Sequence, residues 1–137
     1  MINREPVEIA PALPPVLQGN VLIVDDDPAV CSSLQFSLEL EGFTVRTFSC
    51  GLELLSATDL PHSGCLVIDY RMPGLNGLDL LHRLRQQGNT MPAILITSAP
   101  AHSLLARAGA AGALLVEKPL LGDALIAAIR DQLSSEV

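Results

Sequence analysis

Hydrophobic residues along the chain gather in five short runs, separated by longer segments in which apolar residues recur at helical spacing. The runs cover residues 21–24, 43–48, 65–68, 93–97 and 113–116. Their length is typical of strands, and near-continuous apolar runs are typical of parallel strands that helices cover on both faces. The pattern therefore predicts an α/β domain built on an open, doubly wound, five-stranded parallel sheet.

Five helices are predicted between and after these strands. The first has clear boundaries, because Asp27 is a good N-cap, Pro28 suits the first helical position and Gly42 is placed to end the helix. Its apolar face repeats every four residues, at Val30, Leu34 and Leu38. The other helices are expected at 51–57, at a segment marked by Leu78, Leu81 and Leu84 that ends near Gly88, at 101–110, and at a segment marked by Leu121, Leu125, Ala128, Ile129 and Leu133.

Residues 1–18 differ from the rest of the chain. Four prolines punctuate this segment, which has no lasting hydrophobic periodicity, at Pro6, Pro11, Pro14 and Pro15. This composition predicts an extended or disordered N-terminal tail, with a docking arm as the alternative. The folded domain is expected to cover residues 19–137, a length that suits one domain and is too short for two.

Composition excludes several classes of protein. The net charge of -7, with no basic cluster, argues against nucleic-acid binding by this chain alone. No apolar run approaches the roughly 18 residues of a membrane span, and no secretory signal is apparent, so a cytoplasmic protein is expected. Three widely spaced cysteines argue against a disulfide framework or a zinc site.

Chemically notable side chains follow four of the predicted strands. Asp25 and Asp26 follow the first strand, Asp69 the third, Thr97 ends the fourth, and Lys118, the only lysine, follows the fifth. In a parallel sheet these strand ends lie along one edge, where open α/β sheets place their ligands. We therefore expect these five side chains to converge in one crevice.

The charges at this edge do not balance. If Asp27 caps the first helix, Asp25 and Asp26 face Asp69, and such close like charges force a proton onto one of them unless a cation is present. Lys118 supplies a single positive charge, so the donor set favours a hard divalent ion, most naturally Mg²⁺. Carboxylates, Mg²⁺, a hydroxyl and an ammonium together suit a phosphoryl group, which a carboxylate can itself accept as an aspartyl phosphate.

Four segments carry a family resemblance: "LIVDDDP", "LVIDYRMPGLNGLDLL", "ILITSA" and "VEKPL". In this order the chain resembles a two-component response-regulator receiver domain, from about residue 21 to residue 133. "DYRMPG" and "VEKP" look most like the FixJ-like branch. The resemblance implies a flavodoxin-like sheet with strand order 2-1-3-4-5 and five helices.

The resemblance implies that Asp69 is the phosphoacceptor, receiving a phosphoryl group from a sensor histidine kinase or a phosphotransfer protein. It implies a Mg²⁺ cofactor held by Asp25 and Asp26, with help from Asp69 and the backbone carbonyl of Arg71. Tyr70 and Arg71 follow the phosphoacceptor, where they either tune the access of water or are plain surface positions.

The resemblance also implies a switch. Thr97 and Lys118 are expected to bind the phosphoryl group, Ser98 matches the small residue that follows the threonine, and Pro119 is the candidate for a cis peptide bond. One position departs from the family: receivers commonly have an aromatic residue three positions before the lysine, and here it is Leu115. The switch is therefore either relayed differently or weaker.

The function expected from these features is a signalling domain with weak self-catalysed phosphorylation and dephosphorylation, not a metabolic enzyme. A homodimer through the fourth helix, fifth strand and fifth helix is a possible output. Three alternatives stay open: a phosphatase, disfavoured because Arg71 stands where a second acid is needed; a degenerate receiver that binds proteins without phosphorylation; and a nucleotide binder, disfavoured by the absence of a glycine-rich loop. The sequence does not decide between a stand-alone receiver and a fragment of a longer regulator.

Overall fold

The computed structural model describes residues 19–120 and 123–134. The elements are β1 (Gly19–Val24), α1 (Pro28–Leu40), β2 (Phe43–Phe48), α2 (Gly51–Ser56), β3 (Cys65–Asp69), α3 (Gly77–Gln86), β4 (Ala93–Thr97), α4 (His102–Ala110), β5 (Ala113–Glu117) and α5 (Ala124–Ser134). The predicted tail at 1–18 and the predicted helical position Leu121 lie outside the described residues. No helix in the described ranges is both long enough and apolar enough to cross a membrane.

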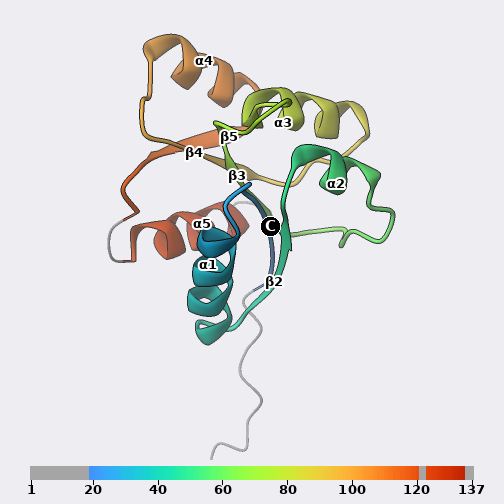
Figure 1. Cartoon of the computed structure of the whole chain (residues 1–137), viewed down its shortest axis with the longest axis vertical. Helices are drawn as coiled ribbons and strands as arrows, with labels where there is room; N and C mark the ends of the chain where they lie inside the picture. The colour runs from blue at the N-terminus through green and yellow to red at the C-terminus, as the bar shows by residue number, and fades with distance from the viewer. Residues whose placement is uncertain (1–18, 121–122, 135–137) are drawn as a thin grey trace, which may run out of the picture.

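The strands form a single parallel sheet in the order β2-β1-β3-β4-β5, as predicted. Helices α1 and α5 lie together on one side of this sheet, and α2, α3 and α4 lie on the other (Figure 1). The fold is therefore the expected doubly wound, flavodoxin-like arrangement, and all strand carboxyl ends share one edge.

The core has two layers, because successive side chains in a strand point to opposite faces. In β1, Leu22 and Val24 belong to the layer beneath α2, α3 and α4, whereas Val21 and Ile23 belong to the layer beneath α1 and α5. All four are 1% exposed or less. Strands β1, β3 and β4 are covered on both faces, which explains the continuous apolar runs in the sequence.

Element boundaries differ slightly from the prediction. Strand β1 begins two residues earlier, at Gly19, because its ladder with β2 extends to the pair Gly19 and Phe43. Strand β5 reaches Glu117, and as an edge strand it leaves Leu114 39% exposed. On α1, Leu38 is buried as predicted while Phe36 is 67% exposed.

Arg85 braces the end of the sheet away from the strand carboxyl ends. Its half-buried guanidinium donates to the backbone oxygens of Ala111 at 3.0 Å and Met91 at 2.6 Å, and also to those of Asn89 and Gly112. These bonds join the end of α3 to the turn between α4 and β5. Because the guanidinium is planar and offers five donors, no other side chain satisfies these carbonyls equally well.

We predict that Arg85→Lys lowers the free energy of unfolding by about 2 kcal/mol, since a single ammonium cannot reach these separate carbonyls. Arg83→Lys, on the exposed face of the same helix, is the matched control and is expected to change stability by less than about 0.5 kcal/mol. Urea unfolding followed by circular dichroism measures both. Equal effects of the two substitutions would show that the Arg85 hydrogen bonds add nothing.

Candidate functional site

The structure gathers three carboxylates at the carboxyl-terminal edge of the sheet. Asp25 follows β1, where its backbone N–H donates to Phe48 O at 3.1 Å and continues the β1–β2 ladder. Asp69 is the last residue of β3. Asp25 and Asp69 are 7% and 6% exposed, whereas Asp26 is exposed. One carboxylate oxygen from each of the three lies within 4.8 Å of the others.

Helix capping keeps Asp27, the third of the three consecutive aspartates, out of this cluster. Asp27 is the N-cap of α1, and its Oδ1 accepts a hydrogen bond from Ala29 N at 2.9 Å. The backbone N–H of Asp27 in turn donates to Asp25 Oδ1 at 2.9 Å. The turn that starts α1 therefore keeps Asp27 out of the cluster and fixes the Asp25 carboxylate, as the sequence predicted for the cap.

Lys118 supplies the positive charge at the cluster. Its Nζ lies 3.1 Å from Asp69 Oδ1, and its side chain is 40% exposed while that of Asp69 is 7% exposed. The backbone N–H of Lys118 donates to Thr97 O at 2.8 Å, which holds the end of β5 beside β4. The Lys118–Pro119 peptide bond is cis.

The surroundings of Asp25 disfavour its charged form. Burial raises the pKa of Asp25 above its ordinary value, and the neighbouring Asp69 charge adds to the effect, while the hydrogen bond from Asp27 N and the more distant Lys118 oppose it. Burial also raises the pKa of Cys31, whose Sγ donates to Asp25 O at 3.3 Å. Sequence reasoning missed this thiol, because nothing in its spacing distinguishes it from an ordinary core cysteine.

Thr97 ends β4, the strand that pairs with β3, and is 2% exposed. Its Oγ1 accepts a hydrogen bond from Ala99 N at 3.2 Å, and its hydroxyl proton has no acceptor among the residues that the structure describes. Ser98 is exposed beyond the end of the strand. Leu115 is half-buried and packs against the core layer beneath α3 and α4.

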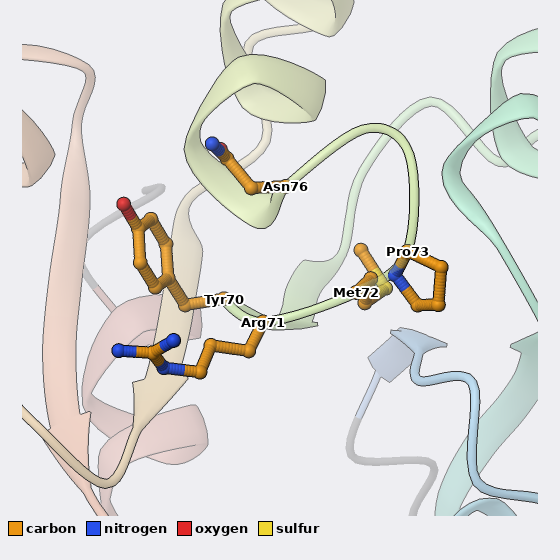
Figure 2. Close-up of a pocket in the computed structure, with 5 residues that line it drawn as sticks. All are labelled: Tyr70, Arg71, Met72, Pro73 and Asn76. Carbon is orange, nitrogen blue, oxygen red and sulfur yellow. The ribbon is translucent and has the colours of Figure 1, made fainter.

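The loop between β3 and α3 passes close to Asp69 because of Gly77. A Cβ at Gly77 would lie 2.6 Å from Asp69 O, and Gly77 N donates to Tyr70 O at 2.8 Å. Sequence reasoning did not single out this glycine, although its place in "MPGLNG" is the available signal. The loop also forms an open pocket lined by Tyr70, Arg71, Met72, Pro73 and Asn76, in which Tyr70 and Arg71 lie at one end and Met72 and Pro73 at the other (Figure 2).

The arrangement is suited to the attack of a carboxylate oxygen on an electrophile. It provides a buried carboxylate held by an ammonium, two further carboxylates with room for a cation, and a hydroxyl with a proton to donate. Of the residues expected at the site, Asp25, Asp26, Asp69 and Lys118 come together directly, and Thr97 joins them through its backbone bond to Lys118. Ser98 and the Arg71 side chain are exposed at its margin.

Known proteins are similar to this chain in sequence and in fold. The FixJ transcriptional regulatory protein of Azorhizobium caulinodans is 40% identical over 114 residues, which cover 82% of this chain and 54% of FixJ. The crystal structure of FixJ-N is similar with a TM-score of 0.74 and 34% identity, over 86% of this chain and 94% of that one. TrrA of Thermotoga maritima, solved in complex with Mg²⁺ and BeF, is similar with a TM-score of 0.73 and 26% identity, over 84% and 99% of the two chains.

This chain spans 27% to 55% of the full length of three curated relatives, among them FixJ. The family model for the response regulator receiver domain matches residues 21–130. The match covers β1 from Val21 onward, the other four strands in full, and the site at the strand carboxyl ends. The chain therefore belongs to the response regulator receiver domain family, in which it is FixJ-like.

Proposed function

We propose that this receiver domain accepts a phosphoryl group on Asp69 in a Mg²⁺-dependent reaction and changes its partner-binding surface in response. The observation that carries the proposal is the ion pair between Lys118 and Asp69 at 3.1 Å beside the carboxylates of Asp25 and Asp26. A buried carboxylate that is paired with one ammonium and has two acidic neighbours contributes little to the stability of the fold, because gathering like charges is unfavourable.

In the proposed reaction an Asp69 carboxylate oxygen attacks the phosphorus of a phosphohistidine on the donor protein. The new O–P bond forms as the P–N bond breaks, and the histidine nitrogen leaves with its electron pair. Lys118 stabilises negative charge on the transferred phosphoryl group, and the Thr97 hydroxyl donates a hydrogen bond to a phosphoryl oxygen. A sensor histidine kinase or a phosphotransfer protein is the proposed donor.

The residues at the site fit a magnesium ion. Carboxylate oxygens are hard ligands of the kind that Mg²⁺ prefers, and one such oxygen from each of the three acids lies within 4.8 Å of the others. Asp25, Asp26 and Asp69 would hold the ion, with the backbone carbonyl of Arg71. The ion would supply charge neutralisation as the phosphoryl group arrives. The complex of the related TrrA with Mg²⁺ and BeF supports this assignment.

A degenerate receiver, which binds partners without phosphorylation, is the second candidate and is not favoured. Its only support is Leu115, because the acids, Thr97 and Lys118 are all in place.

The output surface is proposed to be the face of α4, β5 and α5, where Leu105 and Leu114 are 55% and 39% exposed, and a homodimer through this face is one form of output. Weak self-catalysed phosphorylation and dephosphorylation belong to the same proposal.

We predict that incubation with acetyl phosphate and Mg²⁺ adds one phosphoryl group to the wild-type protein and none to Asp69→Asn, as read by intact mass. Asp79→Asn, an exposed acid in the first turn of α3, is the matched control and is expected to label like the wild type. Labelling of Asp69→Asn would move the acceptor elsewhere. An unlabelled wild type would favour the degenerate receiver.

The raised pKa of Asp25 predicts how the stability of the folded protein depends on pH. Its pKa is raised in the folded state, so between pH 3.8 and the raised value the folded protein binds more protons than the unfolded chain, and stability falls as pH rises through this range. Without divalent cations at pH 7, Asp25→Asn should therefore unfold at a higher temperature than the wild type. Mg²⁺ should raise the unfolding temperature of the wild type and have a smaller effect on the variant.

Asp27→Asn is the control for this experiment. It removes the same charge from the same turn, keeps a side chain that caps α1 equally well, and leaves the carboxylate cluster intact. Thermal unfolding with EDTA and with Mg²⁺ compares the three proteins. If Asp25→Asn and Asp27→Asn respond alike to Mg²⁺, the cluster is not the cation site.

A further inference from the structure

The aromatic residues of this chain are distributed in a way that bears on the switch. The chain contains three phenylalanines, one tyrosine and no tryptophan. Phe36 lies on α1, and Phe43 and Phe48 lie on β2, far from β5 in the strand order. Tyr70 is therefore the one aromatic residue on the β3, β4 and β5 side of the sheet, and it directly follows Asp69.

Tyr70 flanks Thr97 on the same face of the sheet. The β3–β4 register pairs Asp69 with Ile96, and Tyr70 N donates to Ile96 O at 2.9 Å, so Tyr70 extends β3 alongside Thr97. Ala93 and Leu95 of β4 face the core layer beneath α3 and α4, and by alternation Thr97 faces the same way. Tyr70 packs against that same layer.

Leu115 occupies the opposite flank of this row. It pairs with Leu95 across the β4–β5 ladder and packs against the same core layer as Tyr70. On the β3 side, Tyr70 extends the strand alongside Thr97; on the β5 side, Thr97 pairs with the exposed Glu117, and β5 carries no aromatic residue. Because protein interiors are closely packed, a change in the position of Thr97 alters the packing of any large side chain next to it.

The Tyr70 side chain is free to respond. It is only partly buried, and its hydroxyl makes no hydrogen bond to any residue in the part of the chain that the structure describes. Figure 2 shows the ring at the edge of the open pocket, directed away from Met72 and Pro73. Neither a hydrogen bond nor complete burial therefore fixes this ring.

We infer that Tyr70 is the aromatic element of this switch, in place of a residue on β5. This inference rests on the proposed function. When the Thr97 hydroxyl moves to donate to the phosphoryl group, the Tyr70 ring moves inward against the space that Thr97 leaves. Phosphorylation thereby reshapes the surface between the β3–α3 loop and α4, and the missing aromatic residue at 115 does not uncouple the switch.

Tyrosine fluorescence reports on this residue alone, because the chain has a single tyrosine and no tryptophan. The experiment measures acrylamide quenching of this fluorescence before and after treatment with acetyl phosphate and Mg²⁺, with intact mass giving the phosphorylated fraction. We expect the quenching constant of the wild type to fall on phosphorylation, since the ring becomes less accessible.

Two variants separate a relay through Thr97 from simple proximity to the phosphoryl group. Thr97→Val keeps the shape of the side chain and loses the hydroxyl, whereas Thr97→Ser keeps the hydroxyl. At equal phosphorylated fraction, the fall in quenching should be lost in Thr97→Val and kept in Thr97→Ser. An equal fall in Thr97→Val, or no change in a phosphorylated wild type, would overturn the inference and leave the proposed function intact. A wild type that gains no phosphoryl group would overturn both.

Discussion

The gathering of three carboxylates within 4.8 Å of one another is the constraint around which this domain is organised. Burial and the charge of Asp69 raise the pKa of Asp25, so the folded chain carries these charges at a disadvantage in the absence of added cation. The sheet overcomes the repulsion because the acids sit at the ends of strands fixed by ladders and by a two-layer core. The fold thus supplies the stability that holds an electrostatically unfavourable site in a state ready for positive charge.

The two sides of the site differ in how firmly they are held. Asp25 follows β1 and Asp69 ends β3, the apolar side chains of these strands are 1% exposed or less, and the turn that starts α1 fixes the Asp25 carboxylate. Lys118 follows β5, an edge strand with partly exposed side chains, and is itself 40% exposed. Asp25 and Asp69 are therefore firmly held, whereas the Lys118 side chain can adjust when a ligand arrives.

The sequence predicts the fold and the gathered acids because both depend on local patterns. Buried runs of strand length, the Asp27–Pro28 helix start and polar residues at strand ends require no knowledge of the partner strands. The ends of β1 and β5 were missed by one or two residues, since ladder pairing with β2 and β4 decides them. Cys31 and Gly77 were missed for a related reason: their roles depend on which backbone atoms of Asp25 and Asp69 come near, which spacing alone does not reveal.

In the proposed switch, the direction of the change follows from a hydrogen bond that would exist in only one of the two states. A ligand shifts a conformational equilibrium only by as much as it interacts differently with the two states. Among the described residues, the Thr97 hydroxyl proton has no acceptor, so under the proposed function a phosphoryl oxygen would give it a bond that the unphosphorylated chain lacks. A hydrogen bond to a charged group contributes about 1.5–3 kcal/mol, and about 1.4 kcal/mol is a tenfold change in population. This free-energy difference is large enough to move a partly buried ring such as that of Tyr70, whose hydroxyl makes no hydrogen bond to another described residue.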